Sequence, residues 1–97
     1  MPRILIVGAG GIGGLTFDLV VPALEKVGQK CSITIMDGDT VEASNLGHQR
    51  FSPSDVGSFK TTALVQKYEL FNNVYCVSDT ENLRVKEQLQ DFDYIII

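Results

Sequence analysis

Three glycines near the start of the chain have the spacing of a phosphate-binding loop. Gly8, Gly10 and Gly13 follow the apolar run 4–7, precede a helical pattern, and match G-x-G-x-x-G with Gly11 inside the motif. In such a loop the first glycine permits a tight turn, the second lets the backbone approach a phosphate, and the third packs a helix against a strand. The start of the helix adds unpaired N–H groups and a positive dipole. The pattern therefore predicts nucleotide binding rather than a purely structural turn.

An acidic residue stands where a ribose ligand is expected. Asp37 follows the third glycine by about two dozen residues and ends a β-rich run over residues 31–36. A carboxylate at the carboxyl end of this second strand can accept hydrogen bonds from ribose hydroxyl groups. The alternative interpretation is an aspartate that ends a strand and binds no ligand. The glycine loop favours ribose binding. Because NAD and ATP both carry a ribose beside an adenine, Asp37 alone does not distinguish them.

The elements that must position these residues alternate between strand and helix. The run 3–7, which is apolar from Ile4 onward, is typical of a strand buried on both faces of a parallel sheet. A helix is predicted from Gly14 to Gly28, kinked or divided near Val21 by Pro22. Its expected apolar face consists of Leu15, Leu19, Val20, Leu24 and Val27.

The second half of the chain continues this alternation after an irregular segment. Residues 38–57 contain many turn formers and no long periodic run, which is typical of a functional or mobile segment. A second helix is predicted over 58–71, and its inward face is expected to contain Phe59, Ala63, Leu64, Tyr68 and Phe71. A third strand is predicted over 74–77 and a fourth over 93–97. Between them we expect a short helix that begins at the caps Ser78, Asp79 and Thr80, ends at about Gln90, and turns Leu83 and Leu89 inward.

This order predicts an α/β fold, namely four strands of a Rossmann-like, doubly wound parallel sheet in the order 3-2-1-4. The 97 residues suffice for one domain, 1–97, but fall short of two mononucleotide-binding halves, so we expect the N-terminal part of a longer domain. An apolar fourth strand at the edge favours either further chain or a second copy that covers it, and a homodimer is expected.

Composition narrows the function classes. A net charge of −4 and a pI near 4.7 argue against a nucleic-acid partner, because phosphate backbones favour a basic face. No apolar run has the length of a signal peptide core or a membrane span, so a cytoplasmic protein without a membrane partner is expected. Cys31 and Cys76 form no C-x-x-C motif and are interpreted as small core residues.

The segment after the second strand resembles a known signature. Residues 37–49 read D-G-D-T-V-E-A-S-N-L-G-H-Q, similar to D-x-D-x-V-x-x-S-N-L-x-R-Q of the ThiF/MoeB and ubiquitin-activating-enzyme superfamily. The glycine loop before it, and residues 55–57 with Lys60 after it, extend the resemblance over most of the chain. The resemblance implies that Mg-ATP adenylates the C-terminal carboxylate of a ubiquitin-like or sulfur-carrier protein, with loss of pyrophosphate.

The resemblance also implies a role for each matching residue. Asp37 would hold the ribose, Asn45 and Gln49 would orient the phosphates, and Lys60 would neutralise them. Asp39 belongs to the same nucleotide-binding set, and we expect it to hold the loop through backbone hydrogen bonds. The glycines of the phosphate loop, Gly8, Gly10, Gly11 and Gly13, complete the set.

Three departures from the family pattern leave the activity open. His48 stands where the family has an arginine, and Arg50 is a candidate to compensate for it. The family's metal-associated aspartate would follow the strand at 93–97, so no metal ligand is assigned, and the chain begins directly at its first strand without the family's N-terminal arginine. The alternatives are an NAD(P)-binding oxidoreductase module and a non-catalytic nucleotide-binding partner subunit.

Overall fold

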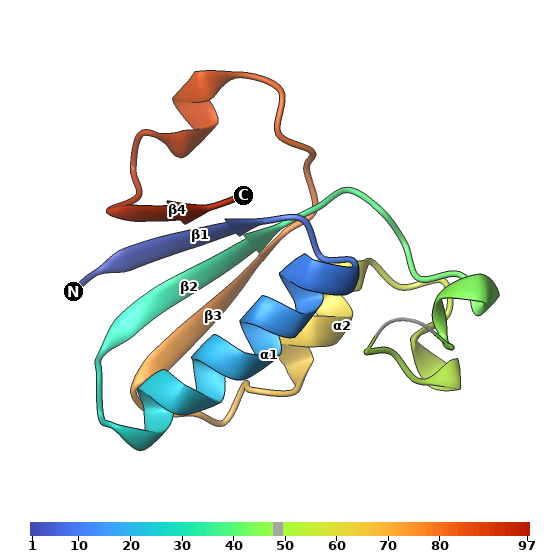
Figure 1. Ribbon diagram of the computed structural model, residues 1–97, viewed down its shortest axis with the longest axis horizontal. Helices are drawn as coiled ribbons and strands as arrows, with labels where there is room; N and C mark the ends of the chain where they lie inside the picture. The colour runs from blue at the N-terminus through green and yellow to red at the C-terminus, as the bar shows by residue number, and fades with distance from the viewer. Residues whose placement is uncertain (48–49) are drawn as a thin grey trace.

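The computed structural model describes residues 1–47 and 50–97, and its four strands form one parallel sheet in the order β3-β2-β1-β4 (Figure 1). This confirms the predicted α/β, Rossmann-like fold class and strand order. Two α-helices lie on one face of the sheet (Figure 1). The elements are β1 (Arg3–Val7), α1 (Gly11–Lys26), β2 (Cys31–Met36), α2 (Lys60–Gln66), β3 (Val74–Asp79) and β4 (Tyr94–Ile96), with 3₁₀ turns η1 (Ala43–Asn45), η2 (Pro53–Asp55) and η3 (Lys86–Leu89).

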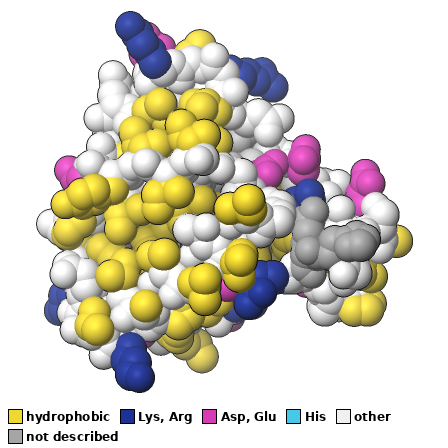
Figure 2. All heavy atoms as spheres, in the orientation of Figure 1, with side chains coloured by type: hydrophobic (Ala, Val, Ile, Leu, Met, Phe, Trp, Pro, Cys, Tyr) yellow, Lys and Arg dark blue, Asp and Glu magenta, His cyan; other side chains and the backbone are white. Residues whose placement is uncertain are grey.

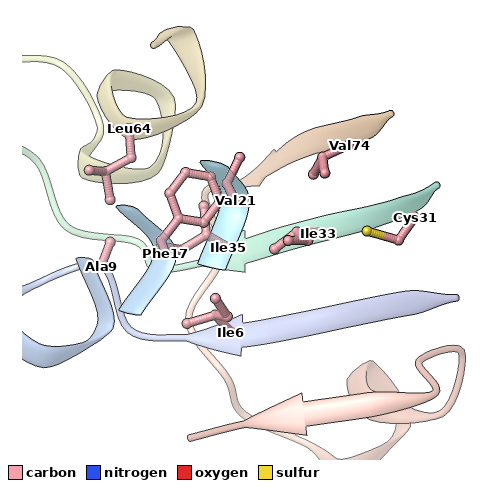
Figure 3. Packing of buried hydrophobic residues seen from close by; sticks show 9 residues of the cluster. All are labelled: Ile6, Ala9, Phe17, Val21, Cys31, Ile33, Ile35, Leu64 and Val74. Atoms are coloured by element: carbon pink, nitrogen blue, oxygen red, sulfur yellow. The ribbon is translucent and has the colours of Figure 1, made fainter. Parts of the chain in front are cut away.

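The core lies between the helices and the two central strands. Side chains of β1 and β2 alternate between the faces of the sheet, and the register pairs Ile4 with Ile33 and Ile6 with Ile35. Phe17 of α1 and Leu64 of α2 pack against the face of the sheet that carries Ile6, Ile33 and Ile35 (Figure 3). The buried cluster comprises Ile6, Ala9, Phe17, Val21, Cys31, Ile33, Ile35, Leu64 and Val74.

The glycine loop joins β1 to α1 with very little space. Gly8 has a φ of +98°, a conformation that L side chains rarely adopt, so the first glycine does permit the tight turn. A β-carbon on Gly13 would lie 1.9 Å from the Gly8 carbonyl oxygen. The third glycine therefore allows the close packing of helix on strand that the motif predicts.

The end of α1 is also defined by a glycine. Gly28 has a φ of +75°, its N–H donates to the Glu25 carbonyl, and the Gln29 N–H donates to the Leu24 carbonyl. These two bonds form a Schellman cap, which satisfies carbonyls that the last helical turn leaves free. Gly28 thus stops the helix as predicted. Of the kink or division predicted near Val21, the division is wrong, because α1 is one helix from Gly11 to Lys26 with Pro22 inside it.

The predicted apolar face of α1 needs correction. Val20 and Leu24 pack against the core as expected, but the fully buried side chains are Phe17 and Val21. The other three residues of the predicted face, Leu15, Leu19 and Val27, are exposed. Together with Ile12 they contribute apolar area to the surface on the side that carries α1, where Figure 2 shows hydrophobic side chains gathered.

The elements after α1 differ from the prediction in their limits. Helix α2 spans Lys60–Gln66 rather than 58–71, and Phe59 is 42% exposed. Strand β3 extends to Asp79, because residues up to that aspartate pair with β2. The predicted caps Ser78 and Asp79 therefore lie in a strand, and a 3₁₀ turn, η3, replaces the predicted helix. The expected fourth strand is present over the shorter range Tyr94–Ile96, and Leu83 and Leu89 are half-buried.

A carboxylate ties the end of α1 to the start of β3. Glu25 Oε1 accepts hydrogen bonds from the backbone N–H groups of Asn73 (2.9 Å) and Val74 (3.1 Å), and Oε2 accepts one from Asn73 Nδ2 (3.0 Å). Burial alone would raise the pKa of Glu25, but the hydrogen bonds from the backbone around Asn73 and from its side chain outweigh burial and lower the pKa. The ionised form of Glu25 therefore stabilises the helix against the sheet.

Both cysteines are free, as expected of core residues. Cys31 is completely buried and Cys76 half-buried. Burial raises the pKa of both thiols, that of Cys76 to about 12, with Cys31 and Glu25 adding to the shift of Cys76. Within the part of the chain that the structure describes, no helix combines the length and apolar character needed to cross a membrane.

The close contact at Gly13 predicts a sharp difference between two glycines of one helix. Gly13→Ala should lower the free energy of unfolding by about 2 kcal/mol or more, because the new β-carbon collides with a backbone carbonyl that cannot move independently. At Gly11 an added β-carbon meets nothing within 4 Å. Gly11→Ala should leave stability unchanged or raise it by up to about 1 kcal/mol. Urea denaturation checks both, and equal effects of the two substitutions would contradict the close-packing account.

The tether at Glu25 predicts a pH-dependent loss of stability. A lowered folded-state pKa gives stability that is present above the unfolded carboxyl value of about 4.3 and is lost as the pH falls through the folded value. Glu25→Gln should therefore lower the melting temperature at pH 7, and the difference from the unmodified protein should shrink toward pH 3. Glu69→Gln, at an exposed carboxylate, is the control and should have little effect at either pH. A constant difference across this range would argue against an ionised tether.

Candidate functional site

The candidate site lies at the carboxyl ends of β1 and β2. Three segments meet there, namely the glycine loop, the residues just after β2, and the long connection from Gly38 to Phe59. The described parts of this connection, 38–47 and 50–59, extend outward past the ends of the strands (Figure 1). Ligands of doubly wound sheets bind at this edge, where the helices that follow the strands begin.

Asp37 links two of these segments through its carboxylate. Oδ2 accepts a hydrogen bond from the Ala9 N–H of the glycine loop (2.8 Å), and Oδ1 accepts one from the Asp39 N–H (2.9 Å). A carboxylate offers about four acceptor positions, so each oxygen keeps room for a further donor. Asp37 thus fixes the glycine loop against the end of β2 and can still accept hydrogen bonds from a ligand.

Three of the predicted site residues line one hollow. Asp39, Asn45 and Lys60 surround a cavity of about 340 Å³ together with Gly38, Thr40 and Glu42. A second hollow of about 390 Å³ shares Gly38 and continues along the residues that follow β3, among them Asn82 and Arg84. The two hollows together line the space beyond the ends of β2 and β3.

Lys60 supplies the positive charge of the first hollow. It is the first residue of α2, its backbone N–H donates to the Asp39 carbonyl (3.0 Å), and its side chain is only 10% exposed. Among the described residues its ammonium has one acidic neighbour, Asp39 Oδ2, at 4.0 Å. An ammonium has three donors, and a mostly buried one beside a polar hollow is well suited to bind an anion.

Asn45 has a structural role with one of its side-chain atoms. Its Oδ1 accepts a hydrogen bond from the Glu42 N–H (2.8 Å) and so closes the 3₁₀ turn η1, while the Glu42 backbone carbonyl accepts from the Asn45 N–H (2.9 Å). This arrangement fixes the rotamer of Asn45 at the wall of the hollow. The Nδ2 group remains a donor for a ligand, since no described residue accepts its protons.

The remaining predicted residues are distributed as follows. Arg50 lies apart from the first hollow, because its Nε donates to Asp18 Oδ2 of α1 at 2.7 Å. The carboxylate that binds loop amides is that of Asp37, whereas the side chain of Asp39 faces Lys60 and is 68% exposed. His48 and Gln49 fall outside the described residues.

Asn82 also belongs to this region, although the sequence did not indicate it. Asn82 Oδ1 accepts a hydrogen bond from the Gly38 N–H (2.8 Å), and a β-carbon on Gly38 would lie 2.9–3.0 Å from the amide of Asn82. Gly38 therefore allows Asn82 to close against the segment that follows Asp37. Asn82 is 44 residues distant in sequence from Gly38, so no local pattern indicates the contact.

A glycine loop at a helix start, an acid at the next strand end and a buried lysine facing the same edge define a nucleotide-binding protein of the Rossmann-like class. The profile of the ThiF family matches residues 1–96. The chain belongs to the ThiF family, and it is a domain of the adenylyltransferase-like, ATP-binding type that this family comprises.

Individual relatives agree with this assignment. The chain is 31% identical over 93 residues to ubiquitin-like modifier-activating enzyme 5 of Arabidopsis thaliana, covering 92% of this chain and 20% of the relative. Escherichia coli MccB, solved with ATP, is 27% identical with a TM-score of 0.68, over 93% of this chain and 26% of MccB. The tRNA N6-threonylcarbamoyladenosine dehydratase TcdA of E. coli shares the fold with a TM-score of 0.79 at 22% identity, over 97% of this chain and 40% of TcdA. The chain thus spans between a fifth and two fifths of the length of these proteins.

The two hydrogen bonds at Asp37 predict that its charge state and its shape are both needed for stability. Asp37→Asn keeps the size but places an NH₂ group opposite one backbone N–H, which should lower the free energy of unfolding by about 1–3 kcal/mol. Asp79 is the matched control, since it also ends a strand but accepts from the Glu81 N–H through Oδ1 alone. Asp79→Asn should have less than half the effect in urea denaturation. Similar losses for both would mean that the link to Ala9 contributes little.

Proposed function

We propose that this chain binds ATP across the ends of β1 and β2 and forms the nucleotide-binding part, residues 1–97, of a ThiF-type adenylyltransferase. The observation that carries the proposal is the buried ammonium of Lys60 in the same hollow as Asn45, two residues of the family signature. The spacing of the glycine loop and Asp37 supports it, because both face the same edge of the sheet. ATP bound to MccB in its solved structure adds to this support.

Each residue has a physical role in this proposal. The loop N–H groups at the start of α1 and the Lys60 ammonium bind phosphate oxygens, and the Asn45 amide donates a further hydrogen bond. Asp37 accepts from ribose hydroxyl groups through the acceptor positions that Ala9 and Asp39 leave free. Gln49 keeps its predicted role as a phosphate ligand.

The proposed reaction is acyl adenylation. A carboxylate oxygen from the C-terminus of a ubiquitin-like or sulfur-carrier protein attacks the α-phosphorus of ATP, the bond from that phosphorus to the bridging oxygen breaks, and pyrophosphate leaves. Charge builds up on phosphoryl oxygens, so the protein contributes positioning and electrostatic stabilisation rather than proton transfer. A structure of MccB with AMPCPP and MccA shows a relative together with both a nucleotide and a second molecule.

A divalent cation would accompany the nucleotide. Asp39 and Glu42 also line the hollow of Lys60, and their carboxylates repel phosphates unless a cation such as Mg²⁺ offsets the charge. In residues 1–47 and 50–97, no three His, Cys, Asp or Glu side chains cluster as a metal site. We propose Mg²⁺ as the cation that accompanies the nucleotide.

A second candidate function is that of a non-catalytic partner that binds the nucleotide without turning it over. It is favoured by the position of Arg50, whose guanidinium lies on Asp18 rather than in the hollow. Lys60 is then the one cation of that hollow among the described residues.

The homodimer predicted from the sequence remains a proposal. It is supported by the exposed apolar side chains of β4, namely Tyr94, Ile95 and Ile96.

The test of nucleotide identity and of Lys60 uses direct binding. Mg-ATP should raise the melting temperature more than NAD at the same concentration, and Lys60→Met should weaken ATP binding about ten- to hundredfold, as expected for one charge-assisted hydrogen bond. Methionine retains the apolar stem of the buried side chain, so the fold should persist. Lys26→Met, at the exposed end of α1, is the control.

The outcomes separate the alternatives. A thermal shift with NAD alone would favour the oxidoreductase module and overturn the ATP assignment. ATP binding without exchange of pyrophosphate into ATP, measured with candidate carrier proteins, would favour the non-catalytic partner. Unchanged affinity in Lys60→Met would remove Lys60 from the site.

A further inference from the structure

A buried carboxylate outside the nucleotide hollow has three donors from two other parts of the chain. Asp18 lies in the middle of α1, and its side chain is 4% exposed. Its Oδ2 accepts from Arg50 Nε (2.7 Å) and Lys67 Nζ (2.8 Å), and its Oδ1 accepts from the Tyr68 hydroxyl (2.5 Å). Two cations and a neutral donor compensate for the burial of one charge.

The three partners differ in what they fix. Lys67 and Tyr68 directly follow α2, and the ring of Tyr68 lies between those of Phe17 and Phe71. Burial, and then the hydrogen bond to Asp18, raise the pKa of Tyr68, so its hydroxyl remains a donor. Arg50 instead belongs to the long connection 38–59, which precedes α2, and it is 32 residues from Asp18 in the chain. Asp18 therefore joins this connection to the rigid helix that begins at the glycine loop.

The connection is held at its base by backbone hydrogen bonds and further out by Arg50 and Phe51. At the base the Val41 N–H donates to the Ser58 carbonyl (2.8 Å), the Gly57 N–H to the Val41 carbonyl (2.9 Å), and the Lys60 N–H to the Asp39 carbonyl (3.0 Å). Beyond the base, the contacts of the described residues with the body of the domain include the ion pair of Arg50 and the packing of Phe51 against the core. Asn45 lies between these two anchored regions.

We infer that Asp18 is a positioning residue of the nucleotide site, which acts through Arg50 to hold the segment that carries Asn45 at the wall of the Lys60 hollow. The inference rests on the proposed function, because it assumes that Asn45 binds the nucleotide. Asp18 touches no nucleotide in this account. Arg50 anchors the segment rather than binding phosphate, which differs from the compensating role predicted for it from the sequence.

The decisive experiment is the ATP affinity of Asp18→Asn. If Asp18 positions the segment, the loss of its charge frees Arg50 and weakens ATP binding by about fivefold to twentyfold, the scale of coupling between residues in one ion-pair network. If Arg50 is instead a phosphate ligand withheld by Asp18, the same substitution tightens binding and overturns the inference. Arg50→Gln, which leaves Asp18 its two other donors, should weaken binding to a similar extent, and the double variant should be no worse than either single one.

Lys67→Met is the matched control. It removes a cation from the same oxygen of Asp18 but leaves Arg50 in place, so it should lower the melting temperature without changing the ATP affinity by more than about twofold. A purely structural role for Asp18 would make the three single variants alike, with affinity following stability. That result would overturn the inference.

If the unmodified protein does not bind ATP, that result refutes the proposed function alone. The anchoring of the segment by Arg50 is then tested by a measurement that needs no nucleotide. Hydrogen exchange of the backbone amides of residues 42–56 should be about tenfold faster in Asp18→Asn and in Arg50→Gln than in Lys67→Met, because local opening is faster where a segment loses its anchor. Amides of α1 and β2 serve as internal references. Equal exchange of residues 42–56 in all three variants would show that Arg50 does not hold this segment.

Discussion

The contact between Gly8 and Gly13 sets how closely α1 approaches the end of β1. A β-carbon on Gly13 would lie 1.9 Å from the Gly8 carbonyl oxygen, and one on Gly14 would lie 3.0 Å from that of Ala9. Because the helix begins so near the strand, the Ala9 N–H comes within 2.8 Å of the Asp37 carboxylate at the end of β2. The glycine loop, the start of α1 and Asp37 therefore form one unit, and the rest of the candidate site adjoins it.

The sequence predicted the order of the strands, but it predicted the buried face of α1 only in part. The order of strands follows from alternating apolar runs and helices, and the structure confirms it. The buried face of α1 was predicted wrongly in part, at Leu15, Leu19 and Val27, because the helix is apolar on two sides and Ile12, Leu15 and Leu19 face outward. Periodicity alone cannot choose between two such faces. Phe17 and Val21 share a helix face with Gly13 and Gly14. The glycine motif, which packs against the strand, therefore indicates which face of α1 is buried.

The limits of the later elements depend on partners that no local pattern shows. Strand β3 continues to Asp79 because that residue pairs with Met36 of β2, although Ser78 and Asp79 have the composition of a helix cap. After Gln66 the chain turns, and the Tyr68 ring packs between Phe17 and Phe71 while its hydroxyl reaches Asp18. Tertiary packing overrode local helix propensity at both places.

The candidate site shows the same division between local and distant information. Spacing after the glycine loop indicated Asp37, the resemblance to the family signature implied Asn45 and Lys60, and the last two line one hollow. Their supports are distant in sequence, since Ala9 is 28 residues from Asp37 and Asn82 is 44 residues from Gly38. Spacing rules can predict a residue type that binds a ligand, but the groups that orient it depend on how the chain folds back.

The distribution of charge determines how such a site can bind a polyanion in an acidic domain. The hollow of Lys60 also contains Asp39 and Glu42, while Asp18 binds both Arg50 and Lys67 on the side of α1. Arg50, the predicted substitute for the family's arginine, is thus paired elsewhere, and Lys60 shares its hollow with two carboxylates. In the proposed function, attraction between net charges then does not account for binding, and recognition depends on backbone N–H groups at the helix start, on the Asn45 amide and on the cation that a nucleotide brings with it. These donors act only at short range and in one geometry, which makes the placement of the connection from Gly38 to Phe59 the quantity on which affinity depends.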